Sequence, residues 1–183
     1  MRLGYARPVA SAITGHTGVL HAGAQLSHRG WVVSLTLAGA PRTDIFAQQA
    51  LPPGRLVAVQ VKAEQGGGFF LGPELAQSSH GEADEWFVLV SLREPAASPA
   101  FFILPRAHIA AAVGTALACF GSSYRQLGAQ NFEGYAGCWE SMESAPLDAP
   151  WRLPRWHWDH RHKWPEAEDA GMPIEPPPDA PVV

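Results

Sequence analysis

Five stretches of this 183-residue chain carry the hydrophobic patterns of β-strands. Residues 31–37, 44–49 and 55–62 are rich in β-branched and apolar residues and lie between glycine- and proline-containing turns, which is typical of strands. Residues 86–92 and 101–104 are almost continuously apolar, as are strands that are buried on both faces of a sheet. The pattern therefore predicts a sheet at the centre of the domain.

Two segments carry helical patterns, one before and one after these strands. Thr14 or Thr17 can cap a helix that runs to about His28, and Gly30 is suited to end it. A second helix is expected over 106–120. Its apolar stripe consists of Ile109, Val113 and Leu117. We therefore predict an α/β fold with a central mixed sheet flanked by helices.

The remaining segments of the core region are less regular. Residues 1–12 are expected to form an extended lead-in. Residues 64–84 are rich in glycine and serine without a clear period, which predicts a mobile loop between two strands. Residues 122–144 show no clear period either, but their aromatic side chains are expected to pack on the core. These are Tyr124, Phe132, Tyr135 and Trp139.

The C-terminal segment differs in composition from the rest of the chain. Residues 146–183 contain nine of the 17 prolines and four of the seven tryptophans. We therefore divide the chain into a domain at 1–145 and a Pro/Trp/His-rich tail at 146–183. The end of the tail, 173–183, is expected to be disordered or linker-like.

Charge and cysteine content narrow the class of protein. The formal net charge of −4 argues against a strong nonspecific nucleic-acid binder. Residues 146–183 hold seven acidic and four basic side chains. Residues 1–145 hold ten acidic and nine basic side chains, so the predicted domain is nearly neutral. Two cysteines are too few for a disulfide framework, and no apolar run is long enough to span a bilayer. We expect a cytoplasmic protein without a signal peptide or membrane partner.

One set of polar residues predicts chemistry at the sheet. Gln60 and Lys62 are two positions apart on a predicted strand and therefore share a face. If the segment at Asp44 pairs with that strand as a hairpin, its carboxylate lies beside Gln60. An acid, an amide carbonyl and an ammonium can together hold Mg²⁺ or Mn²⁺ next to a phosphate. The alternative is a turn aspartate next to the solvent face of an edge strand.

These residues resemble the PD-(D/E)xK nuclease superfamily, which has the restriction-endonuclease-like fold. Residues 41–44 stand in for the PD half, and Gln60-Val61-Lys62 stands in for (D/E)xK in the QxK form of some small prokaryotic homing-endonuclease and resolvase-like proteins. The resemblance covers roughly residues 13–118 and includes the Gly30-Trp31 pair after the first helix.

The resemblance implies an endonuclease that hydrolyses DNA phosphodiester bonds in prokaryotic defence or a mobile element. Asp44, Gln60 and the Val61 backbone carbonyl would bind the metal, and Asp44, Gln60 and Lys62 would form the catalytic set. A homodimer that cuts both strands is one arrangement that it implies.

The sequence departs from that family at one position. Members of this branch often carry a metal-binding glutamate early in the first helix, where Val19 stands here. His16, His21 or Glu64 could supply a further ligand. With fewer anions Mg²⁺ binds more weakly, so the alternative is a catalytically weak or inactive binding module.

A second candidate site lies in the tail, at 156–164, where three histidines and an aspartate alternate with tryptophans. Three interpretations stay open. The segment can pack back on the domain, contact a protein partner or single-stranded nucleic acid through its tryptophans, or bind a metal through His157 and His162 with their neighbours.

Overall fold

A computed structural model describes residues 7–36, 42–51, 54–77, 84–92, 98–121, 124 and 126–182. Its helices are α1 (Arg7–His28), α2 (Arg106–Phe120) and the short α3 (Trp156–Asp159). Its strands are β1 (Trp31–Leu35), β2 (Ile45–Gln49), β3 (Leu56–Glu64), β4 (Glu85–Ser91) and β5 (Ala100–Pro105). Short 3-10 turns lie at Pro73–Ala76, Ala129–Tyr135, Trp139–Glu143, Pro146–Asp148, Arg161–Lys163 and Pro165–Ala167.

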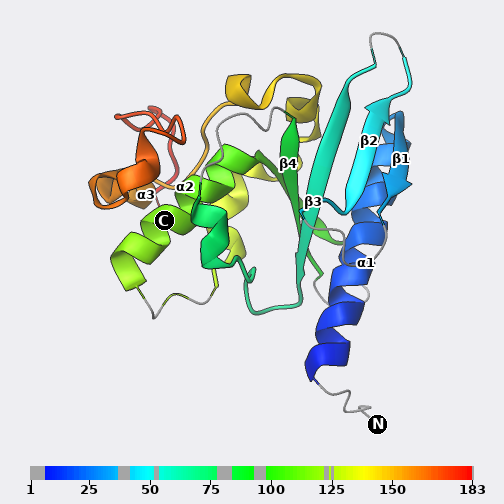
Figure 1. The fold of residues 1–183 in the computed structure, drawn as a ribbon, viewed down its shortest axis with the longest axis horizontal. Coiled ribbons are helices and arrows are strands. Elements are labelled where there is room, and N and C mark those ends of the chain that lie inside the picture. Colours follow the sequence, from blue (N-terminus) through cyan, green and yellow to red (C-terminus); the bar gives the residue numbers. More distant parts are fainter. Residues whose placement is uncertain are drawn as a thin grey trace.

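The five strands form one mixed sheet in which spatial order equals sequence order, β1-β2-β3-β4-β5. The β1–β2, β2–β3 and β4–β5 pairs are antiparallel, and β3–β4 is parallel. Helices lie on both sides of the sheet (Figure 1). The predicted α/β class, with a central mixed sheet flanked by helices, is confirmed.

Helix α1 covers one face of the sheet. Alternate residues of β2 and β3 point toward it and join a buried cluster with Ala22 and Leu26 of the helix. Gly18 lets the helix approach closely, because a Cβ built there would lie 2.5 Å from the Cβ of Ala63. Residues of β3 with odd numbers, such as Val59 and Val61, therefore face α1.

Helix α2 covers the opposite face, but only over β4 and β5. Phe87 and Leu89 of β4 pack in its cluster, while Val88 on the same strand packs in the α1 cluster. Strand β4 is therefore buried on both faces, as its continuous apolar run predicted.

The first three strands leave that second face uncovered by any helix of the described part of the chain. Val32 of β1 is 60% exposed, Phe46 of β2 45% and Leu56 of β3 55%. All three belong to the alternate set of residues that points away from α1. An open apolar surface therefore extends over the β1–β2–β3 part of the sheet.

The two edges of the sheet differ. Strand β5 is covered, since Ala136 forms a bridge with Phe102 and the Gly137 N–H donates to the Phe101 carbonyl at 2.9 Å. Among the described strands β1 pairs only with β2, so its outer side is an unpaired edge.

The C-terminal segment packs along the outer side of α2 (Figure 1). Trp158 and Trp164 are 6% and 4% exposed and belong to the same buried cluster as α2. Near the end, the Arg155 N–H donates to the Pro181 carbonyl at 2.8 Å. The core thus runs across the boundary that we placed at residue 145.

Two predictions about irregular segments are wrong. Residues 7–12 are helical rather than extended, and Pro8 is compatible with a first helical turn, where backbone N–H groups have no intrahelical partner. The predicted loop at 64–84 contains a 3-10 turn, and its Phe69, Leu71 and Leu75 are buried against α2. Residues 78–83 of that loop, residue 37 of the first predicted strand and residues 38–41 of the turn that follows it lie outside the described part.

No helix within the described ranges has the length and apolar character that crossing a membrane requires.

Candidate functional site

The predicted hairpin is present, and Asp44 lies directly before its first strand. Ile45 pairs with Val59 in the antiparallel β2–β3 register. The Asp44 N–H donates to the Val59 carbonyl at 2.9 Å, and the Asp44 carboxylate accepts from the Val61 N–H at 2.7 Å. On the other side, the Thr36 N–H donates to the Asp44 carbonyl at 3.0 Å. Asp44 is therefore fixed between β1 and β3.

Val61 is the residue between Gln60 and Lys62, so the hydrogen bond to its N–H places the Asp44 carboxylate next to both. Because Val61 faces α1, Gln60 and Lys62 point to the opposite, open face of the sheet. All three members of the predicted set are half-buried. They belong to one neighbourhood where β2 and β3 meet.

Two of these side chains carry polar groups without a partner in the described part of the chain. The Gln60 Oε1 atom is buried and accepts no hydrogen bond from any described residue. Lys62 makes no ion pair or hydrogen bond with the described residues either. A buried carbonyl oxygen without a donor carries a free-energy cost that a bound cation or water would remove.

The oxygen atoms here suit a hard divalent cation. Asp44 supplies a carboxylate, and Gln60 supplies the partnerless amide oxygen. The N–H and C=O of one strand residue point toward the same neighbouring strand, so the Val61 carbonyl faces the side on which Asp44 lies. These three oxygen donors fit the preference of Mg²⁺ and Mn²⁺ for oxygen ligands with retained water.

Glu64, at the end of β3, serves a structural role. Its carboxylate accepts hydrogen bonds from the N–H groups of Gly66, Gly67 and Gly68 and from the Ser91 hydroxyl of β4. Burial alone would raise the pKa of Glu64, but these hydrogen bonds outweigh it and hold the pKa below the ordinary glutamate value. Both carboxylate oxygens are engaged, so Glu64 does not act as a spare ligand. The signal in the sequence was an acid followed closely by three glycines.

Helix α1 supplies no acid to the site. It packs on the face of the sheet that carries Val61 and Ala63, opposite the face of Gln60 and Lys62. His16 and His21 are exposed on this helix, and Val19 packs against the α1 cluster. No cluster of three or more His, Cys, Asp or Glu side chains arranged to hold a metal occurs within the described ranges.

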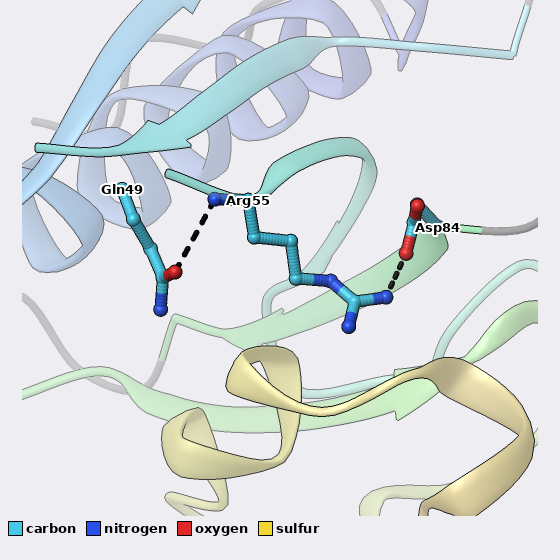
Figure 2. Close-up of polar contacts among 3 residues, drawn as sticks. All are labelled: Gln49, Arg55 and Asp84. Atoms are coloured by element: carbon cyan, nitrogen blue, oxygen red, sulfur yellow. Dashed lines mark hydrogen bonds and ion pairs between the residues drawn. The ribbon is translucent and has the colours of Figure 1, made fainter. Parts of the chain in front are cut away.

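Arg55 lies just before β3, and its polar contacts hold the register of the strands that brings these residues together (Figure 2). The Arg55 N–H donates to Gln49 Oε1 at 3.3 Å, and the Arg55 guanidinium forms an ion pair with Asp84. The Ala58 N–H donates to the Asp84 carbonyl at 2.9 Å. Asp84 has a φ of 83°, a left-handed conformation that turns the chain into β4. One arginine thus links β2, β3 and the entry to β4.

The histidines of the tail are dispersed rather than convergent. His157 is fully buried and its Nδ1 lies 2.5 Å from the Thr115 hydroxyl of α2, whereas His162 is exposed. His160 Nδ1 contacts the Trp156 carbonyl at 2.8 Å. Of the three interpretations, packing on the domain describes this segment in the structure.

Sequence reasoning missed one residue at the site. Phe46 of β2 pairs with Ala58 of β3, so it shares the open face with Gln60, and it is 45% exposed. The available signal was the alternation of a strand, which puts Ile45 and Ala47 on one face and Phe46 on the other. In the structure Ile45 and Ala47 are fully buried and Phe46 is exposed.

Comparison with protein-family models, with curated proteins and with solved structures finds no match to this chain.

Proposed function

We propose that the chain is a metal-dependent endonuclease that hydrolyses DNA phosphodiester bonds at Asp44, Gln60 and Lys62. The observation that carries the proposal is the hydrogen bond between the Asp44 carboxylate and the Val61 N–H. It brings the acid against the backbone that separates an amide carbonyl from an ammonium. The five-stranded mixed sheet with a helix on each face also supports the restriction-endonuclease-like assignment.

The residues divide the chemistry between them. A bound divalent cation would lower the pKa of a coordinated water and offset charge on the phosphate. Asp44 and Gln60 Oε1, with the Val61 carbonyl, would hold that cation. Lys62 would orient the attacking water and stabilise the developing charge on the phosphate oxygens. The water would lose a proton to solvent as its oxygen forms a bond to phosphorus, and the leaving sugar oxygen would take up a proton from solvent as its bond to phosphorus breaks.

A second candidate is a binding module that has lost catalysis. The observation that favours it is that the described residues supply a single available carboxylate, since Glu64 is engaged and α1 lies on the other face. One carboxylate gives weaker Mg²⁺ binding than two. The two candidates differ in cleavage, which is directly measurable.

The test is a nicking assay on supercoiled plasmid with Mg²⁺ or Mn²⁺. We expect Asp44→Ala and Lys62→Ala each to reduce cleavage at least about 100-fold, the scale of losing one electrostatic or acid–base group. Gln48→Ala, an exposed change on β2, is the matched control and should cleave like the parent chain. Thermal unfolding of all variants checks that they fold.

Each outcome decides between the candidates. Cleavage that survives both substitutions contradicts this assignment of residues. No cleavage by the folded parent chain at any divalent cation concentration, together with retained binding of DNA, would favour the binding module.

A further inference from the structure

The open face of the sheet carries an aromatic ring, that of Phe46, close to the proposed cleavage site. Phe46 of β2 pairs with Ala58 of β3, and Ala58 lies two residues, about 7 Å, before Gln60 along that strand. Its side chain therefore lies on the same face as Gln60 and Lys62, and the Asp44 carboxylate accepts from the Val61 N–H between these two. This inference rests on the proposed function, because it concerns the substrate of that same site.

The neighbours of Phe46 leave its ring accessible. Phe46 pairs with Ser34 on β1 and with Ala58 on β3, and both of these side chains are small. The ring is therefore not enclosed between cross-strand neighbours, which agrees with its 45% exposure. A buried core phenylalanine of this chain, such as Phe87 at 1%, is enclosed on all sides.

The chemistry of the face changes over this short distance. The Asp44 end carries a carboxylate, an amide oxygen without a described partner and a lysine, whereas Ser34, Phe46 and Ala58, which lie in one row across the strands, carry no charge. The next residue of that row, Glu85 of β4, is in an ion pair with Arg106. A nucleotide has the same division, with a charged phosphate at one end and an uncharged, flat base at the other. A polar site for the phosphate next to an accessible ring is complementary to both parts.

We propose that Phe46 is a stacking platform for an unpaired base of the strand that is cut at the Asp44–Gln60–Lys62 site. Single-stranded or locally unpaired DNA is then the preferred substrate, because a base held in a duplex already stacks on its neighbours and cannot present its face to the ring. Phe46 is a specificity-determining residue and takes no part in bond breaking.

The first measurement is binding of a fluorescein-labelled single-stranded oligonucleotide to the full chain, by anisotropy at fixed salt with Ca²⁺ in place of Mg²⁺. Phe46→Ala should weaken binding by about 5- to 150-fold, the range for loss of one base–aromatic stack. Phe46→Trp keeps a flat ring and should bind within about threefold of the parent chain. Binding of the matching duplex should weaken less than about threefold in Phe46→Ala.

A control separates stacking from general loss of apolar surface. Leu56→Ala removes an exposed aliphatic side chain from the same open face. It should leave single-strand binding within about twofold of the parent chain, since an aliphatic chain offers no aromatic ring. An equal loss in Leu56→Ala and Phe46→Ala overturns the proposal in favour of a hydrophobic partner. A change from dimer to monomer in Phe46→Ala, with oligonucleotide binding unchanged, overturns it in favour of a second copy.

Failure of this inference and failure of the proposed function give different results. If Asp44→Ala abolishes cleavage but Phe46→Ala binds and cleaves single strands like the parent chain, the nuclease stands and the platform is wrong. If Phe46→Ala loses single-strand binding while the parent chain shows no cleavage, the stacking role of Phe46 is supported and the nuclease proposal is wrong. If the folded parent chain neither binds nor cleaves DNA, both are wrong.

Discussion

The buried His157 contributes to how the stability of this protein responds to acid. The Thr115 hydroxyl donates to the Ala111 carbonyl at 2.7 Å, so its single proton is used and His157 Nδ1 must donate to the hydroxyl oxygen. His157 Nε2 then carries the lone pair, and it has no partner among the described residues. Burial, and secondarily the nearby His160, lowers the pKa of His157 to about 3.

The sign of the pH dependence follows. Between about pH 6.5 and pH 3 the unfolded chain binds a proton at residue 157 and the folded chain does not, so the free energy of unfolding falls as pH falls. This stabilisation is fully present above pH 6.5. His108, whose pKa burial also lowers to about 3, adds to the same window.

We expect His157→Asn to flatten this dependence by about one proton, or about 1.4 kcal/mol per pH unit. Urea unfolding at several pH values between 4 and 7 would measure the slope. The exposed His162→Asn is the matched control and should keep the slope of the parent chain. An unchanged slope in His157→Asn would show that the ring is not held neutral in the folded protein.

Glu64 gives a second prediction for a single residue. Glu64→Gln removes the charge that accepts three backbone N–H groups and the Ser91 hydroxyl, so the free energy of unfolding at pH 7 should fall by about 2–3 kcal/mol. Denaturant titration measures the change, with exposed Glu140→Gln as the control. A loss no larger than that of the control would mean that the turn does not depend on this carboxylate.

At the scale of elements, the same glycine-to-alanine substitution should change the stability of the protein in opposite directions in two helices. A Cβ at Gly114 of α2 would lie 2.2 Å from the Trp164 ring, whereas nothing lies within 4 Å of a Cβ at Gly15 of α1. Gly114→Ala should destabilise the protein by about 1–3 kcal/mol through overpacking. Gly15→Ala should stabilise it by about 0.5–1 kcal/mol because alanine is the better helix former.

Thermal and denaturant unfolding of the two glycine variants, side by side, provide the measurement. Equal effects of the two substitutions would mean that Trp164 does not pack against α2 in solution.

Elements with a regular hydrophobic period were predictable from the sequence. The helix at 106–120 was found with its observed bounds, and all five strands were found, because alternation and continuous apolar runs report burial directly. The hairpin that brings Asp44 to β3 was also predictable, since the turn between the two strands is short.

Segments whose burial depends on distant partners were not predictable in this way. Phe69 and Leu71 sit in a glycine-rich stretch without a period, and they are buried because α2 and Leu127 lie against them. The role of Glu64 depends equally on Ser91, which is 27 residues away and comes near through the parallel β3–β4 pair. The sequence therefore indicated where the acid, amide and lysine meet, but not which neighbouring acid was already engaged.

At the scale of the whole molecule, residues after Gly137 complete the core on both faces of the sheet. Trp139 and Met142 join the α1 cluster, and the Arg29 guanidinium lies 4.8 Å from the Trp139 ring. Trp158 and Trp164 join the α2 cluster. A protein that ends at residue 145 would retain the first pair and lose the second.

We expect a shortened protein of residues 1–145 to fold poorly. Removing a buried tryptophan costs about 3–5 kcal/mol, so losing Trp158 and Trp164 approaches the entire stability of a typical domain, about 5–15 kcal/mol. Circular dichroism and urea unfolding would show it, and removal of 173–183 alone is the milder control. Cooperative unfolding of 1–145 at the urea concentration of the parent chain would establish it as an independent domain.

The order of the strands bears on how the molecule is made. Each strand of the sheet is hydrogen-bonded to the strand synthesised just before it, so a chain emerging from the ribosome can add each new strand to a growing edge. No earlier pairing has to be reopened to admit a later one. Trp158 and Trp164 are made after α2, so the α2 surface that they bury stays uncovered until translation has passed Trp164.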